Sequence, residues 1–386
     1  MPEKHTYAKH SIVVDEVGWS FVLALALVPL LYGANVPLAW GANGIVFSLL
    51  LLFLVIVQTF THHPTPVSLS RIWLASTAFG IVFLWIFLQT QSWMPESLHA
   101  PIWRYASSLL EEELPGSISV NPTESQFGLL RLATAFAVFY LALQFGRERH
   151  WAKRIVICVA GAGTLHAIYA MGLRLMGEET AALFLSESLF KLDQTKSLTG
   201  TFINRDHFAI YLGLSITCVW ALLVHDLRTK IVPHGYNDRR EIIAHIYSMS
   251  ASIGWYAIFL MPLTVAILMT ASRAGFVLPF SAILLVSILE WHLPASPTNQ
   301  MTKPNLGNKR FVWVPVTIAI LGIVAGLLTH GDDLGGRIAG TKTENDIDPR
   351  INVAAVALKA RADRPLLGHG YGTLADVFPA YRDASV

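Results

Sequence analysis

The sequence is poor in charge and in cysteine. Charged residues make up 14% of the 386 positions, hydrophobic residues make up 53%, and the formal net charge is only +2. So small a charge argues against a nucleic-acid partner, and so large an apolar share excludes an ordinary soluble globule. Only Cys158 and Cys218 are present, both inside apolar runs, which excludes a disulfide framework or a cysteine metal site. What remains is a polytopic membrane protein.

Long apolar runs are what the sequence has instead. A helix needs roughly 20 apolar residues to cross a bilayer core of about 30 Å, because no backbone polar group can be left unpaired in hydrocarbon. The sequence therefore predicts an all-α polytopic helical membrane protein with about nine transmembrane helices. The runs are approximately 17–33, 40–60, 72–90, 126–145, 153–173, 207–227, 251–270, 274–291 and 312–329. We divide the chain into a transmembrane domain, 1–329, and an external, partly helical segment, 330–386, which we expect to be incomplete.

Lysine and arginine in the short loops predict the orientation of these helices. Basic residues in the N-terminal head and in the loops 146–154, 228–250 and 292–311 fall on one side if the N-terminus is cytoplasmic. The turn 34–39 has no basic residue and the loop 94–125 has only Arg104, so both suit the opposite side. That side is then the periplasmic one.

Two arginines on the predicted periplasmic side lie at turns that lead into apolar helices. Arg205 lies in the polar loop 200–208, and Arg273 lies in the tight turn 270–275. A guanidinium beside the first N–H groups of a helix is suited to hold a phosphate. One such arginine is often only a headgroup anchor, but two on the same side favour an anion site.

Other charged positions have plainer interpretations. Arg131 lies about two turns inside the fourth run, where it either snorkels to the surface or faces a polar site. The acidic residues between Asp332 and Asp348 match no metal-binding loop, so we expect a solvated loop and no metal. Residues 350–362 place Ile351, Ala354, Ala355 and Leu358 at helical spacing, which predicts an amphipathic helix near the membrane.

Four separated segments, residues 118–122, 200–208, 270–275 and 350–372, together resemble the O-antigen ligase and Wzy-type polymerase superfamily of bacterial envelope glycosyltransferases. Residues 200–208 resemble its G-T-F-x-N-R-N-H-F turn, and residues 270–275 resemble its T-x-S-R-G-G turn. Residues 350–372 resemble its R-x-helix-x-P-L-x-G-x-G-x-G segment, and residues 118–122 resemble a turn of its exopolysaccharide-type members. Three departures occur, which are Asp206 for the usual Asn, Ala274 for a frequent Gly, and His369 between the turn glycines.

The resemblance implies a metal-independent transferase of the bacterial inner membrane, with its active face in the periplasm. It would move a glycan from undecaprenyl diphosphate to a sugar, a lipid or a growing polymer, among membrane lipids and without a cofactor. The choice between ligase and polymerase stays open, with a slight preference for polymerisation. The alternative is a polytopic transporter or flippase for lipid-linked glycans, which should show more ionisable residues near the bilayer midplane than Arg131 and His166.

The resemblance also implies the roles of the site residues. They are Arg205, Arg273, Asn204, His207, Ser272 and Arg350. Arg205 and Arg273 would be catalytic groups that grip the diphosphate, and Asn204 and Ser272 would support them through hydrogen bonds. Arg350 is a third, weaker candidate.

A general base is needed to activate the acceptor hydroxyl, and an imidazole is suited to that task. The resemblance implies that the family's catalytic histidine lies beyond Val386. We therefore expect a truncated chain that is inactive as it stands. His207 and His369 are the only substitutes, and for His207 we favour a supporting, substrate-binding role.

Overall fold

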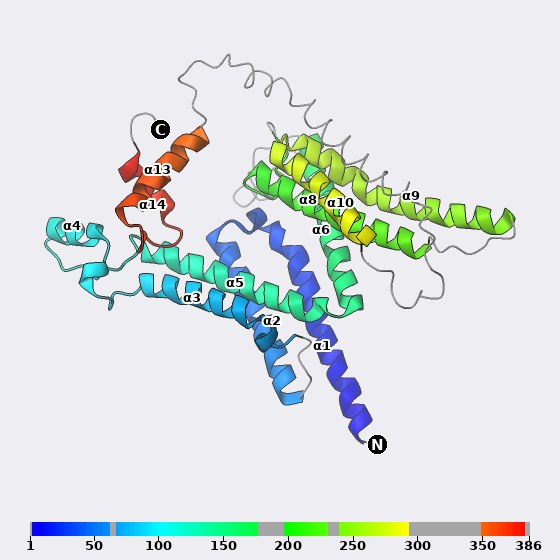
Figure 1. The fold of residues 1–386 in the computed structure, drawn as a ribbon, viewed down its shortest axis with the longest axis horizontal. Helices are drawn as coiled ribbons and strands as arrows, with labels where there is room; N and C mark the ends of the chain where they lie inside the picture. The colour runs from blue at the N-terminus through cyan, green and yellow to red at the C-terminus, as the bar shows by residue number, and fades with distance from the viewer. Residues whose placement is uncertain (1, 62–66, 177–196, 231–238, 293–348, 383–386) are drawn as a thin grey trace, which may run out of the picture. The chain divides into compact units, whose positions relative to one another are not determined.

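The computed structural model describes residues 2–61, 67–176, 197–230, 239–292 and 349–382 (Figure 1). Within these ranges the regular elements are helices and no strand occurs. The long helices are α1 (Pro2–Leu27), α2 (Pro37–Thr61), α3 (Trp73–Gln89), α5 (Pro122–Gly146), α6 (Arg149–Met176), α8 (Arg205–Lys230), α9 (Arg239–Met269) and α10 (Arg273–His292). The shorter ones are η1 (Val28–Leu30), η2 (Tyr32–Ala34), η3 (Leu69–Ile72), η4 (Glu96–Leu98), α4 (Pro101–Leu110), α13 (Pro349–Asp363) and α14 (Leu374–Tyr381).

Six described helical stretches are long and apolar enough to cross a membrane. They are Val13–Leu30, Pro37–Phe60, Leu69–Gln89, Pro122–Gly146, Arg149–Met176 and Arg205–Asp226, and they match the first six runs of the sequence. The seventh and eighth runs are helical in α9 and α10, but their described apolar parts, Ile253–Met269 and Val277–Leu289, are shorter. The run 312–329 lies outside the described residues. An all-helical membrane protein is thus supported among the described residues, while the multi-pass topology, the count of nine and the orientation stay predictions.

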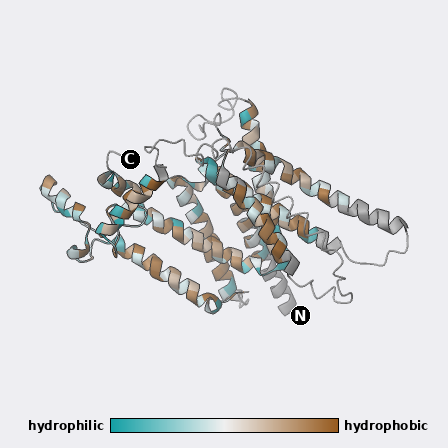
Figure 2. Cartoon of the chain, turned by 45° about the horizontal axis from the view of Figure 1, so that its top comes forward, coloured by the Kyte–Doolittle hydropathy of each residue, from teal (hydrophilic) through white to brown (hydrophobic). Residues whose placement is uncertain are grey.

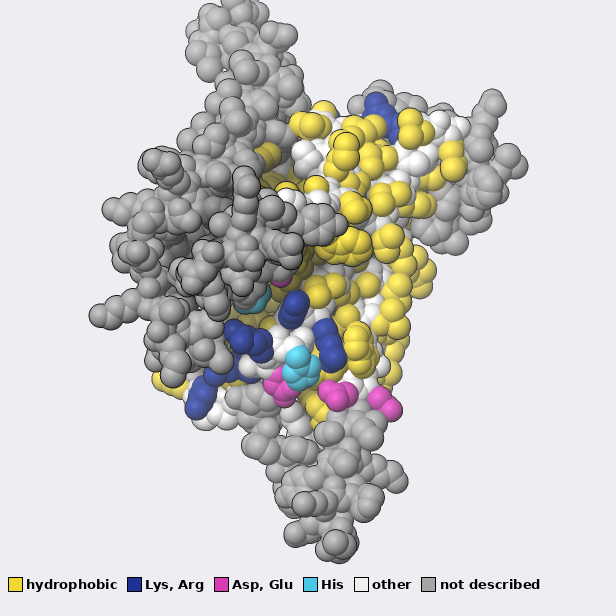
Figure 3. All heavy atoms as spheres, turned by 90° about the vertical axis from the view of Figure 1, so that its right-hand side faces the viewer, with side chains coloured by type: hydrophobic (Ala, Val, Ile, Leu, Met, Phe, Trp, Pro, Cys, Tyr) yellow, Lys and Arg dark blue, Asp and Glu magenta, His cyan; other side chains and the backbone are white. Residues whose placement is uncertain are grey.

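The surface of these helices is apolar. Ile81, Leu84 and Leu165 are among the many large hydrophobic side chains that are exposed on them. Figure 2 shows hydrophobic residues along the long helices, and Figure 3 shows hydrophobic side chains over much of the described surface on one face, with charged ones mainly in its lower part and one basic side chain near the top. Apolar patches this extensive are not stable against water, so lipid is the solvent that suits them.

The chain divides into two compact units. The first comprises Met1–Val17, Trp40–Arg147 and Gly340–Val386, and the second comprises Gly18–Ala39 and Glu148–Ala339. The domain boundary that we expect near residue 330 lies outside the described residues. It stays a prediction.

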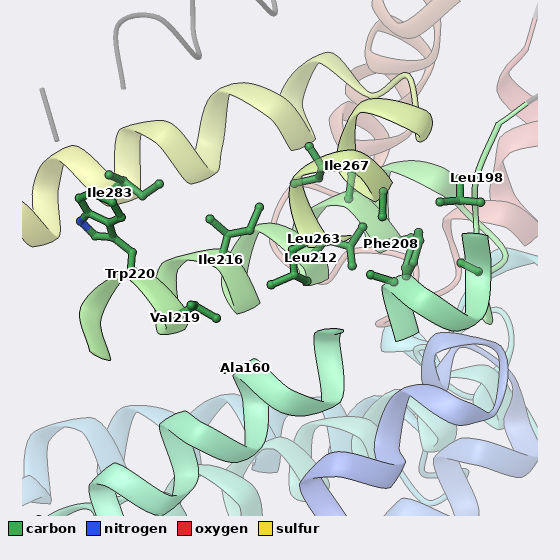
Figure 4. Close-up of a cluster of buried hydrophobic side chains, with 14 of the residues drawn as sticks. Ala160, Leu198, Phe208, Leu212, Ile216, Val219, Trp220, Leu263, Ile267 and Ile283 are labelled. Carbon is green, nitrogen blue, oxygen red and sulfur yellow. The ribbon is translucent and has the colours of Figure 1, made fainter. Parts of the chain in front are cut away.

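The second unit has its core between α6, α8, α9 and α10. Phe208, Leu212 and Ile216 of α8 are buried against Leu263 and Ile267 of α9. Figure 4 shows Leu198 and Phe208 at one end of this cluster, and Trp220 beside Ile283 at the other. The cluster includes residues of all four helices, and close van der Waals packing of this kind is what holds helices together in a membrane.

Small residues let α8 and α10 approach closely and in parallel. A Cβ on Gly275, near the start of α10, would overlap Ala209, near the start of α8. Further along, a Cβ on Gly213 would lie 2.5 Å from Pro279, and then Trp220 Nε1 donates to Ser287 Oγ at 3.0 Å. All three pairs follow the same direction in both helices. Close approach through small residues is the usual way for apolar helices to associate in a membrane.

The first unit holds α2, α3 and α5. The rings of Phe79 and Phe136 stack with centroids 4.6 Å apart, which joins α3 to α5. The buried Gln144 amide accepts from Val67 N at 3.1 Å and donates to Val67 O at 2.7 Å. A backbone amide that cannot bond within a helix is thereby satisfied.

The close approach of α8 and α10 predicts the effect of enlarging Gly213. Gly213→Val should destabilise the protein by about 1–3 kcal/mol, because the new side chain overlaps Pro279 and the helices must separate. The control is Gly254→Val in α9, where a Cβ meets no atom within 4 Å. Thermal unfolding of both variants in detergent measures the difference. Equal stability of the two variants would contradict the packing described here.

Candidate functional site

The turn that leads into α8 is capped by Asn204. Its Oδ1 accepts from Asp206 N at 2.7 Å, and its backbone oxygen accepts from Phe208 N at 3.1 Å. An asparagine is among the favoured residues for this N-cap position, because it pairs an N–H group that has no partner within the helix. Arg205 is then the first residue of α8, and its side chain is exposed, as is that of His207.

The turn that leads into α10 is built in the same way. The buried Ser272 accepts from Gly275 N through its Oγ at 3.1 Å, so it caps α10 as Asn204 caps α8. Arg273 is the first residue of α10, and its side chain lies outside the described residues. The residue before the cap, Ala271, has a φ of 52°, in the left-handed region that L residues seldom adopt.

The two capped turns lie side by side. Gly275 packs on Ala209, so the first turns of α8 and α10 are adjacent. The loop before α8 also reaches the turn before α10, since Leu198 N donates to Met269 O at 3.1 Å. Two segments that lie far apart in the sequence, and that resemble the same family, thus meet at one end of the second unit.

A third turn, between α1 and α2, reaches the same place. Thr201 Oγ1 donates to Pro29 O at 2.7 Å, and Phe202 lies against Gly33. The sequence predicts a turn here, at 34–39, but does not connect it with Arg205, because the turn carries no charge and belongs to no motif. Pro29, Gly33, Asn35 and Pro37 are the local indications of a tight turn there.

The supporting residues therefore have structural partners. Asn204 and Ser272 both act as helix caps, and their contact with a ligand stays a prediction, as does that of His207. Arg350 is the second residue of α13, in the first unit, and its side chain lies outside the described residues. Its grouping with Arg205 and Arg273 also stays a prediction.

The other two motif segments meet in the first unit. Val120 N donates to His369 O at 2.9 Å, and Ser125 Oγ donates to Tyr371 O at 3.0 Å. Gly370, with a φ of 111°, passes so close to Ser119 that a Cβ would overlap its side chain. Only glycine combines this conformation with this approach.

Arg364 also joins the segment after α13 to the segment between α3 and α5. Its Nη2 donates to Leu98 O at 2.6 Å and its Nη1 donates to Ile118 O at 3.1 Å. Burial lowers the pKa of this guanidinium from its ordinary value. One forked cation thus joins the segment after α13 to two carbonyl groups of the loop between α3 and α5.

His369 has a structural environment. Its Nε2 lies 2.9 Å from Ala360 O, and its ring packs edge-on against Tyr381 with centroids 5.8 Å apart. A hydrogen bond with the Asp363 carboxylate, together with burial, raises the pKa of Tyr381. Packing in the glycine turn explains His369 without assigning it a catalytic role.

Arg131 reaches back toward the start of α5. Its Nη2 lies 3.2 Å from Glu124 Oε1, and its guanidinium lies 4.2 Å from the centre of the Trp40 ring. Glu124 is two turns nearer the helix start, so the side chain extends toward that end as a snorkelling arginine does. Of the two interpretations of Arg131, the geometry favours the anchor.

The predicted helix is present as α13, and the apolar stripe expected to face the membrane is exposed. Val356 and Ala360 are buried, whereas Ile351, Ala354, Ala355 and Leu358 are exposed. Their contact with a membrane stays a prediction.

No family model, curated protein or solved structure matches the chain. The family assignment therefore remains a resemblance carried by four motifs. What the structure adds is that these motifs meet in two pairs, one in each unit.

The Arg364 contacts predict how the C-terminal segment is attached. Arg364→Ala should remove the bonds to Leu98 O and Ile118 O and cost about 1–3 kcal/mol of local stability. Limited proteolysis should then cut the loop between α3 and α5 faster than in the parent chain. Arg361→Ala, one turn earlier and exposed, is the control. An unchanged cleavage rate in Arg364→Ala would show that the segment is held by other contacts.

Proposed function

We propose that the chain binds the diphosphate of a lipid-linked glycan at the adjacent starts of α8 and α10. There it would take part in glycan transfer, as a ligase or polymerase of the bacterial envelope. The observation that supports this proposal is the meeting of two arginine-bearing turns that resemble one family. It would act at the periplasmic face of the inner membrane, on undecaprenyl diphosphate as the glycan carrier.

The electrostatics of this end suit a dianionic group. Each helix carries roughly +0.5 of a unit charge at its N-terminus, and each begins with an arginine. Both helices point the same way, so their fields add at the shared end. The negative charge of Asp206 reduces the positive potential at this end. A carboxylate in the first turn of α8 nevertheless stabilises the helix itself.

The proposed transfer needs charge stabilisation more than covalent chemistry. An acceptor hydroxyl oxygen forms a bond to the first sugar's anomeric carbon, and the bond from that carbon to the diphosphate oxygen breaks. The lipid diphosphate leaves with the electron pair, and the hydroxyl proton passes to a base. Arg205 and Arg273 would stabilise the leaving group's charge, which is the term that fixed cations supply best. We assign the base to neither His207 nor His369.

Removing either arginine should weaken diphosphate binding. In the purified chain in lipid nanodiscs, Arg205→Ala and Arg273→Ala should each lower the affinity for undecaprenyl diphosphate. A lost charge-assisted pair is worth about 2 kcal/mol, or on the order of 30-fold. Arg205→Lys and Arg273→Lys should recover little of the lost affinity, because lysine cannot make a forked contact with the diphosphate.

Arg149→Ala is the matched control, because Arg149 is also the first residue of a long helix of the second unit. It lies at the opposite end, since His166 and Gly163 of α6 pack antiparallel against Tyr211 and Ser215 of α8. Undecaprenol, which lacks phosphate, should bind all four proteins equally. Equal affinity of the parent and Arg205→Ala for the diphosphate would refute the proposal, and substrate-dependent movement of the lipid across vesicles would favour a transporter.

A further inference from the structure

The turn between α1 and α2 has an uncommon backbone. Tyr32, Gly33 and Ala34 have φ values of 51°, 63° and 60°, so three consecutive residues are left-handed. Two hydrogen bonds close the turn, from Ala34 N to Leu31 O at 2.8 Å and from Asn35 N to Tyr32 O at 3.2 Å. Residues other than glycine rarely adopt this conformation unless their surroundings impose it, and such strain gathers at functional sites.

The surroundings that impose it belong to the loop before α8. Gly33 is so close to the Phe202 ring that a Cβ would overlap it. The buried Thr201 hydroxyl donates to Pro29 O at 2.7 Å. The strained turn therefore contacts two consecutive residues of the segment that ends in Asn204 and Arg205.

Phe202 is held from the other side as well. Its ring centroid lies 5.4 Å from that of Phe208 and 5.4 Å from that of Tyr211, both on α8. The ring is thus fixed between the left-handed turn and the first turns of α8. Phe202 lies three residues before Arg205 in the same short loop, so we expect displacement of the ring to shift the Asn204 cap and Arg205 as well.

We propose that the turn Pro29–Ala34 positions Arg205, with Gly33 and Thr201 as positioning residues of the anion site. Gly33 leaves the space that the Phe202 ring occupies. Thr201 holds the loop before α8 against the turn through its hydrogen bond to Pro29 O. That the site binds a diphosphate rests on the proposed function, whereas the positioning of the loop before α8 by the turn does not. The turn contributes geometry and no charge, which is why charge-based reasoning overlooks it.

Gly33→Ala tests the inference, with two measurements on the full chain in nanodiscs. The added methyl should displace Phe202 and raise hydrogen exchange of the amides of Asp206, His207 and Phe208 by about tenfold. It should also weaken undecaprenyl diphosphate binding by about tenfold, as the displaced arginine loses its contact. Thr201→Val, which keeps the shape and removes one hydrogen bond, should act in the same direction by about threefold.

Two further variants separate positioning from general damage. Gly41→Ala in α2 is the control, because a Cβ there meets no atom within 4 Å. Phe202→Leu, introduced into Gly33→Ala, should relieve the overlap and return exchange and affinity toward the parent values. Rescue of this kind is not expected if the glycine merely supports folding.

The outcomes are distinct. Normal exchange and normal affinity in Gly33→Ala would overturn the inference and leave the proposed function standing. Exchange raised equally throughout the second unit, without rescue by Phe202→Leu, would also overturn it. Raised exchange confined to the start of α8, in a parent chain that binds no diphosphate, would support the positioning role and refute the proposed function.

Discussion

The close parallel contact between α8 and α10 is the constraint on which the candidate site depends. Two helices that begin at the same end of a bundle present their first N–H groups and their first side chains to the same region. That requires small residues at the contact, which Gly275, Ala209 and Gly213 provide. With larger side chains the helices would separate, and Arg205 and the start of α10 would no longer adjoin. The apolar cluster of the second unit, which includes Phe208 of α8 and Ile283 of α10, then keeps these two helices aligned.

Polar contacts also hold the turns at the starts of α8 and α10 in place. Asn204 caps α8 and Ser272 caps α10. Thr201 joins the loop before α8 to the turn between α1 and α2 through its hydrogen bond to Pro29 O. Residues with positive φ occur at this end in Tyr32, Gly33, Ala34, Gly200 and Ala271, and in the first unit in Glu111 and three glycines of the segment 368–372. Of those at this end, Tyr32, Ala34 and Ala271 carry a side chain, so their backbone is strained and must be held by the packing around it.

Much of the fold follows from the sequence, because long apolar runs admit only helices in a membrane. The turns at Arg205 and Arg273 could also be placed, since a short polar stretch before a long apolar run predicts a turn that leads into a helix. The caps explain why Asn204 and Ser272 stand where they do, a simpler role than ligand support. The sequence could not give the pairing of α8 with α10, or the part played by Gly33. Both depend on contacts between residues far apart in the chain, and Gly33 carries no chemical group that marks it. Arg131 shows the opposite case, in which a conspicuous charge pairs with Glu124 and has a local explanation.

The central claim is that Arg205 and Arg273 hold one and the same diphosphate. A double-mutant cycle on undecaprenyl diphosphate affinity tests it most directly, with Arg205→Ala, Arg273→Ala and the combined variant. If both guanidinium groups clasp one headgroup, the combined variant should bind little worse than either single variant, with a coupling free energy of at least about 1 kcal/mol. Strictly additive losses, or no loss in either single variant, would contradict the account.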